Sequence, residues 1–175
     1  MKIISIKDDP NIINFLKENL RLIPEPHLLE NYHPDYEYYP GNIFRYISKG
    51  KFDIGNYYVL VTDSGEYAGS LGWNQLNEST ATLIRMYVPE KFRTDFVIGE
   101  HILPIVLKET ANYQHTWATF NDYNKAAYTA LERLYTGKSS SLMPWPSIYK
   151  NFKPLGQKTV NTVLQYVAEY ERSIP

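Results

Sequence analysis

ATLIRMYVPEKFRTDFVIGEHILPIVL, residues 81–107, changes from a strand pattern to a helix pattern around a short basic loop. Residues 81–88 combine β-forming side chains with a period of two, which predicts a strand. One predicted face carries Thr82, Ile84, Met86 and Val88, and the other carries Ala81, Leu83, Arg85 and Tyr87. After Pro89 and the loop, helical spacing returns at Ile102, Leu103, Val106 and Leu107. Such a junction directs backbone N–H groups and the positive end of a helix dipole toward one point, which suits a phosphate-bearing ligand.

Further strands flank this segment on both sides. Residues 57–62 and 66–75 form a predicted hairpin around a turn at residues 63–65. A second turn at Asn77-Glu78 leads into the strand at residues 79–88, so the three strands predict an antiparallel meander. The remaining strands are predicted at residues 2–7, 115–120, 146–153 and 159–169.

Helices are predicted in the connections between the strands. Asp8-Asp9-Pro10 is a typical helix start, and apolar side chains at helical spacing extend this helix over about residues 10–22. Asn121-Asp122 precedes a second helix, whose apolar stripe is Ala127, Ala130, Leu131 and Leu134. Residues 42–49 are compatible with one short helix. The order of elements predicts a single α+β domain over residues 1–175, of the α/β sandwich type, with a mixed and mostly antiparallel sheet of about six or seven strands flanked by helices.

The composition excludes several classes of protein. The chain has 175 residues with a net charge of −1, so no excess of positive charge points to nucleic acid or to an anionic membrane. Cysteine is absent, which excludes disulfides, thiolate metal sites and a cysteine nucleophile and is typical of a reducing compartment. No apolar run approaches the roughly 20 residues that a membrane span needs. We therefore expect a cytoplasmic protein without a metal and without a nucleic-acid or membrane partner.

Two segments resemble the GNAT superfamily of N-acetyltransferases. Residues 83–93, LIRMYVPEKFR, are similar to its fourth strand and the opening of its pyrophosphate loop. Residues 121–134, NDYNKAAYTALERL, are similar to its strand-to-helix motif, in which an Asn is followed three residues later by an Ala, here Asn124 and Ala127. The order of elements is similar over nearly the whole chain, and the motifs lie within residues 57–135.

The resemblance implies that acetyl-CoA is the acyl donor and that a small-molecule or peptide amine is the acceptor. In this superfamily a bulge in the fourth strand, here near Met86 and Val88, exposes backbone amides that hold the pantetheine arm and polarise the thioester carbonyl. The amine then attacks directly, with proximity supplying much of the rate. The residues implied to contact acetyl-CoA are Met86, Val88, Arg93, Thr94, Gly99 and Asn124.

The phosphate loop departs from the superfamily pattern Arg-x-x-Gly-x-Gly. Counted from Arg93, the glycine positions hold Phe96 and Ile98, and Gly99 follows one residue late. Glycine at these positions lets amides approach a pyrophosphate without an intervening Cβ. We therefore predict a narrow cleft with weak affinity for CoA. The residues predicted to form apolar cover for the sheet instead are Phe96, Val97, Ile98 and Ile102.

Pro104 limits where the helix after this loop can begin. Proline is tolerated in the first turn of a helix but costs about 3 kcal/mol in its interior. The sequence therefore leaves two alternatives: a kinked helix, or a helix that starts late, near residue 102, after a lengthened loop.

The general acid of the superfamily is often a tyrosine seven residues after the motif Asn. Leu131 holds that position here. Tyr128 and Tyr135 lie about one helical turn to either side, and they are the candidate catalytic residues.

A general base is not evident from the strands. Residues 57–62 and 81–88 contain no Asp, Glu or His, although Asn74 and Tyr87 are able to position a water molecule. Catalysis through backbone amides does not depend on such side chains. Two functions therefore stay open: an acetyl-CoA-dependent N-acetyltransferase, or a GNAT-like domain that has lost CoA binding and serves as a binding or interaction module.

Overall fold

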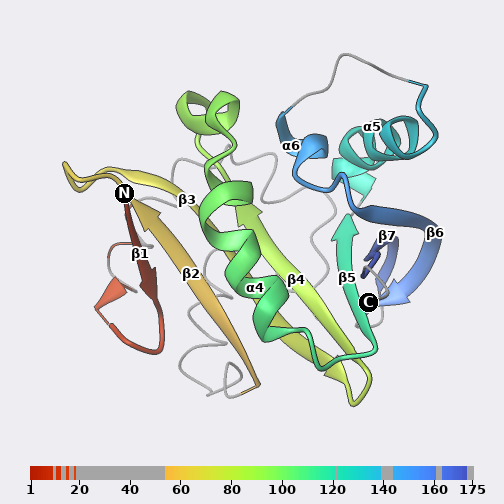
Figure 1. Cartoon of the computed structure of the whole chain (residues 1–175), viewed down its shortest axis with the longest axis horizontal. Coiled ribbons are helices and arrows are strands. Elements are labelled where there is room, and N and C mark those ends of the chain that lie inside the picture. The colour runs from red at the N-terminus through yellow and green to blue at the C-terminus, as the bar shows by residue number, and fades with distance from the viewer. Residues whose placement is uncertain are drawn as a thin grey trace.

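A seven-stranded mixed sheet forms the centre of the fold, in the strand order β1-β2-β3-β4-β5-β7-β6 (Figure 1). The computed structural model describes residues 1–9, 11–12, 15, 18, 54–120, 122–138, 144–160 and 163–172. The strands are β1 (Lys2–Ser5), β2 (Gly55–Val61), β3 (Tyr67–Asn77), β4 (Thr80–Tyr87), β5 (His115–Phe120), β6 (Phe152–Val160) and β7 (Val163–Tyr170). Strands β4 and β5 pair in parallel, and the other neighbours pair antiparallel. The predicted α+β class with a mixed, mostly antiparallel sheet is confirmed.

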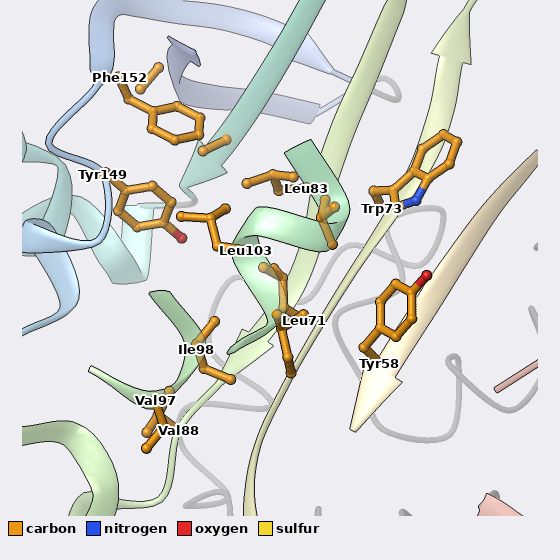
Figure 2. Close-up of a cluster of buried hydrophobic side chains, with 14 of the residues drawn as sticks. Tyr58, Leu71, Trp73, Leu83, Val88, Val97, Ile98, Leu103, Tyr149 and Phe152 are labelled. Atoms are coloured by element: carbon orange, nitrogen blue, oxygen red, sulfur yellow. The ribbon is translucent and has the colours of Figure 1, made fainter. Parts of the chain in front are cut away.

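Helices cover one face of this sheet. The helical elements are η3 (Glu90–Asp95), η4 (Ile98–Ile102), α4 (Leu103–Glu109), η5 (Asp122–Asn124), α5 (Lys125–Tyr135) and α6 (Pro144–Ser147). Val106 of α4 and Leu131 of α5 are buried in one hydrophobic cluster with Leu71 and Leu83 of the sheet. Figure 2 shows Leu103 of α4 lying over Leu71 and Leu83. Each such buried side chain contributes about 1.5–3 kcal/mol. Among the described helices, none has the length and apolar character of a membrane span.

A second, smaller cluster lies on the opposite face of the sheet. It joins Tyr57 and Val59 of β2 to Tyr67 of β3 and to Ile12, which follows β1. The start of the first predicted helix is visible here, because the Asp9 carboxylate accepts a hydrogen bond of 3.0 Å from the backbone N–H of Asn11. Ile12, Phe15 and Glu18 are helical, and the other residues of the predicted helix from residue 13 to 22, with the possible helix at residues 42–49, lie outside the described residues.

The predicted meander of β2, β3 and β4 is confirmed. The turn between β2 and β3 is closed by backbone hydrogen bonds from Thr62 to Glu66 and from Gly65 to Thr62, each 2.9 Å long. Gly65 has φ of +87°, a conformation that side-chain-bearing residues rarely adopt.

The prediction for the closing strands is wrong in its boundaries. Residues 144–147 are helical as α6, and β6 begins only at Phe152. Pro146 has no N–H to donate to a strand ladder, which is why its neighbourhood does not extend a sheet. Instead its carbonyl accepts a hydrogen bond of 3.0 Å from Tyr149 N–H, which closes a helical turn. Strands β6 and β7 then form an antiparallel pair.

A β-bulge interrupts β4. Ser70 of β3 pairs with Tyr87, and Gly72 pairs with Ile84, so β4 contains one more residue than β3 over this interval. Because of the extra residue, the side chains after the bulge point to the opposite face from the one that strict alternation would give them. Met86 therefore packs against the α4-side cluster, whereas Ile84 and Tyr87 pack against the opposite one. The alternation predicted for residues 81–88 is correct as far as Ile84 and wrong beyond it, because strict period two has no place for a bulge.

Candidate functional site

The connection between β4 and α4 is helical rather than an open loop. Pro89 begins it, and its carbonyl accepts a hydrogen bond of 2.8 Å from the backbone N–H of Phe92. The 3-10 helix η3 then ends at Asp95, and Phe96, which follows it, has φ of +52°. An L-residue in this left-handed conformation costs about 1–2 kcal/mol, and glycine is the residue that adopts it without strain. Phe96 therefore has a backbone conformation typical of glycine, and it stands at a position where the superfamily pattern has a glycine.

A π-helical turn joins this connection to α4. In η4, the N–H of Leu103 donates to the carbonyl of Ile98, five residues earlier. The regular α-helix begins at Leu103, with Pro104 in its first turn. Because proline lacks an N–H and its ring clashes with the carbonyl four residues earlier, the wider π turn accommodates it. The late start is therefore the correct alternative, with a π turn in place of a lengthened loop.

The apolar side chains of this connection cover the sheet with one exception. Val97, Ile98 and Ile102 are at most 3% exposed, which confirms the predicted cover for these three. Ile98 lies against Gly69 of β3, where a Cβ atom would be 2.7 Å from Ile98 Cδ1. The prediction is wrong for Phe96, whose side chain is 42% exposed, because the left-handed backbone turns it outward.

A pocket lies where the β4 bulge meets the connection. Its lining is formed by Met86, Val88, Phe92, Arg93, Phe96, Val97, Ile98 and Ile148. Its cavity volume is about 20 Å³, far below the roughly 300–1,000 Å³ of most small-molecule pockets. Arg93 supplies the positive charge in an otherwise apolar lining. Its Nε donates a hydrogen bond of 2.9 Å to the carbonyl of Val88, which ties the connection to the end of the strand.

The structure brings together three of the six residues expected to contact acetyl-CoA. Met86, Val88 and Arg93 line the pocket. Thr94 is exposed on η3, and its hydroxyl donates to Asp95 over 3.4 Å. The remaining two lie elsewhere.

Gly99 and Asn124 do not belong to the pocket lining. Gly99 is in η4, where a Cβ atom would lie 3.1 Å from Cγ2 of Ile148, so this glycine permits close packing of Ile148. Asn124 is exposed at the start of α5, and its side chain does not cap that helix.

The two candidate tyrosines of α5 make contacts away from the pocket lining. Tyr128 is buried, and its hydroxyl accepts a hydrogen bond of 2.7 Å from the backbone N–H of Gly156 in β6. Burial raises the pKa of Tyr128. Tyr135 is exposed, and its hydroxyl donates to Glu171 over 3.2 Å.

Tyr149 is a candidate that the sequence did not reveal. Its hydroxyl donates to the thioether sulfur of Met86 over 3.5 Å, so it lies directly beside the pocket. Figure 2 shows the ring of Tyr149 next to Phe152 and its hydroxyl directed away from Phe152, toward Leu103 of the core cluster. Burial raises the pKa of Tyr149. The residue was assigned to a strand, and the proline pair at residues 144 and 146 is the signal that argued against that assignment.

The residues expected to position a water lie on the opposite face. Tyr87 stacks on Tyr67 with ring centroids 6.1 Å apart. Burial raises the pKa of Tyr87, whereas the Arg93 guanidinium acts in the opposite direction. Asn74 accepts a hydrogen bond of 3.1 Å from Thr82. Among the described residues, no group of three or more His, Asp or Glu side chains is placed to hold a metal ion.

Comparisons with known proteins agree with this geometry. No protein-family model matches the sequence, and no curated protein matches it. Solved structures do match. An acetyltransferase of the GNAT family from Staphylococcus aureus Mu50 is 14% identical, with a TM-score of 0.61 over 97% of this chain and 100% of the other. Spermidine N-acetyltransferase from Vibrio cholerae, solved with CoA and spermine, is 11% identical, with a TM-score of 0.57 over 96% of this chain and 92% of the other. The chain therefore has the fold of the GNAT acetyltransferases.

Proposed function

We propose that the protein is an N-acetyltransferase that transfers an acetyl group from acetyl-CoA to an amine. The observation that carries this proposal is the β4 bulge between Ile84 and Tyr87, which meets a pocket containing Arg93. A bulge leaves backbone N–H groups outside the regular ladder, where they are available to a ligand. The fold is also that of a spermidine N-acetyltransferase solved with CoA and spermine, which supports a small amine as acceptor.

The proposed reaction uses the backbone for charge stabilisation. The amides at Met86 and Val88 face the thioester carbonyl and stabilise the negative charge that develops on its oxygen. The amine nitrogen attacks the carbonyl carbon, the C–N bond forms and the C–S bond breaks. One proton leaves the nitrogen and one reaches the departing thiolate, so no further reagent is consumed.

The donor is held along the connection between β4 and α4. Arg93 contacts the phosphates of acetyl-CoA, because its guanidinium is the cation of the pocket lining. We assign further contacts to Thr94, Gly99 and Asn124, which lie on η3, η4 and the start of α5. Tyr128 and Tyr135 are the candidates that the resemblance offers as acids for the thiolate, and the hydroxyl of each has another partner.

The test is thermal denaturation of the protein with increasing acetyl-CoA. A ligand at a hundred times its dissociation constant stabilises the folded state by roughly 2.7 kcal/mol. The expected result is a rise in Tm that saturates with concentration. An unchanged Tm at millimolar acetyl-CoA and millimolar CoA contradicts the proposal.

The second candidate function is a binding module without CoA. The small volume of the pocket favours it, together with the side chains of Phe96 and Ile98 at the positions where the superfamily has glycine. This candidate predicts no change of Tm with either nucleotide.

A further inference from the structure

A departing thiolate is stabilised by a hydrogen-bond donor close to the bulge. Leu131, at the position of the superfamily's helix tyrosine, is 1% exposed and has no hydrogen bond to offer. The hydroxyls of Tyr128 and Tyr135 are bonded to Gly156 of β6 and to Glu171, which do not belong to the pocket lining. The tyrosines of α5 therefore leave this role unfilled.

Tyr149 brings a hydroxyl to the bulge from another element. Its O–H donates to the sulfur of Met86 over 3.5 Å, and Met86 is both a bulge residue and part of the pocket lining. The residue before it, Ile148, also lines the pocket. The hydroxyl is thus one side chain away from the space that the donor sulfur enters in the proposed function.

The position of Tyr149 is fixed by its surroundings. Its ring meets Phe120 edge-on at 5.3 Å and Phe152 at 5.2 Å between centroids. Its backbone carbonyl accepts a hydrogen bond of 2.8 Å from Phe152 N–H. Aromatic contacts of this kind restrict the ring, so the hydroxyl is preorganised toward β4.

The present acceptor of this hydroxyl is a weak one. A thioether sulfur accepts hydrogen bonds poorly, whereas a thiolate carries a full negative charge and accepts them strongly. The phenol is protonated at neutral pH, and burial raises the pKa of Tyr149 further, so the side chain holds its proton and acts as a hydrogen-bond donor. The side chain of Met86 is unbranched and adaptable, so it can turn aside when a ligand sulfur arrives.

We propose that Tyr149 donates a hydrogen bond to the sulfur of CoA and so stabilises the departing thiolate, an assignment that rests on the proposed function. As the C–S bond breaks, the phenol keeps its proton and the sulfur accepts the hydrogen bond. The proton that leaves the attacking nitrogen reaches the sulfur through water. The proton balance closes between amine and thiol.

The test measures the pKa of the thiol of bound CoA, which requires no knowledge of the acceptor. The thiolate is followed by its ultraviolet absorbance, and the complex with a CoA analogue lacking the thiol is subtracted. The chain contains no cysteine, and the subtraction also removes the absorbance of the ionising tyrosines, so the difference signal is that of the CoA thiolate. The expected result is an ionisation constant about tenfold smaller in the Tyr149→Phe complex than in the wild-type complex, because one hydrogen bond to the thiolate is lost.

Two matched variants identify the tyrosine responsible. Tyr128→Phe and Tyr135→Phe remove hydroxyls that bond elsewhere, and each should leave the pKa of the bound thiol unchanged. Met86→Leu removes the competing sulfur while keeping a side chain of similar size, and it should lower that pKa further. This variant gives a second reading if the Tyr149→Phe protein does not fold.

The outcomes separate this inference from the proposed function. If CoA binds and the thiol pKa is the same in the wild-type and Tyr149→Phe complexes, the inference is overturned and the proposed function stands. A shift caused by Tyr128→Phe instead also overturns it, as does a raised thiol pKa with Met86→Leu. If CoA does not bind the wild-type protein, the proposed function fails and the inference fails with it.

Discussion

Arg93 Nε donates a hydrogen bond of 2.9 Å to the carbonyl oxygen of Val88, and this bond connects the positive charge of the pocket to the end of β4. The same side chain thus shapes the turn and presents a cation to it. Two separable consequences are expected when it is removed, one for stability and one for ligand binding.

Arg93→Ala should weaken acetyl-CoA binding by about tenfold or more, because a charge-assisted contact to phosphate is lost. The difference from wild type should shrink in high salt, since a screening length of about 3 Å at 1 M weakens exposed charge contacts. Calorimetric titration at two salt concentrations measures both effects. Lys91→Ala is the matched control, because Lys91 pairs with Glu66 on the surface and should leave the affinity unchanged. If the Arg93→Ala and wild-type proteins bind acetyl-CoA with equal affinity, Arg93 does not contact the ligand.

Phe96→Gly combined with Ile98→Gly should raise the affinity for CoA while lowering the stability. The gain follows because the amides of this turn are no longer shielded by large side chains. The loss comes from Ile98, which is 1% exposed, because emptying such a site costs at least about 2–5 kcal/mol. Titration with CoA and denaturation in urea measure the two effects. If the affinity of the double variant for CoA stays constant or falls, the side chains of Phe96 and Ile98 are not what obstructs CoA binding.

Phe96→Gly alone separates strain from packing. Phe96 has φ of +52° and is 42% exposed, so glycine relieves the backbone strain and loses little packing. The expected gain in unfolding free energy is about 0.5–1 kcal/mol after the entropy of the unfolded glycine is counted. A destabilised variant would show that the exposed ring has a structural role.

Gly69→Ala should destabilise the protein more than Gly65→Ala does. A Cβ at Gly69 would lie 2.7 Å from Ile98 Cδ1 and 3.1 Å from the carbonyl oxygen of Tyr87, whereas Gly65 has nothing within 4 Å of that position. Both glycines have positive φ, so both substitutions strain the backbone, and we expect the contacts at Gly69 to add about 1–3 kcal/mol. Chemical denaturation of both variants measures it, and equal costs contradict the contact between Ile98 and β3.

Stability should fall as the pH rises above about 10, where tyrosines of an unfolded chain ionise. Burial raises the pKa of Tyr67 and Tyr149, so the folded state holds these protons when the unfolded state has released them. The unfolded state then binds fewer protons, and the free energy of unfolding decreases by up to about 1.4 kcal/mol per pH unit for each such group. Urea denaturation across this range measures the slope. It should be shallower for Tyr149→Phe, and a flat profile for the wild type contradicts the burial.

Local patterns in the sequence were sufficient for most of the fold. The turn at Gly65 and the alternation of β2 and β3 are properties of a few neighbouring residues, and they predicted the hairpin. The bulge between Ile84 and Tyr87 depends on pairing with Ser70 and Gly72 across the sheet, which alternation within one strand does not contain. Only the resemblance implied it.

The candidate site was predictable only in part for the same reason. Met86, Val88 and Arg93 lie within one short segment and meet in the pocket. Tyr149 reaches Met86 from a residue 63 positions away in the sequence, through a helical turn that was assigned to a strand. Contacts of this range come from tertiary packing, and no local pattern contains them.

The most direct measurement is a crystal structure of the protein grown with acetyl-CoA. We expect the thioester beside Met86 and Val88 at the β4 bulge, with the phosphates at Arg93. Acetyl-CoA bound at another place on the sheet, or an unoccupied pocket at saturating acetyl-CoA, contradicts this expectation.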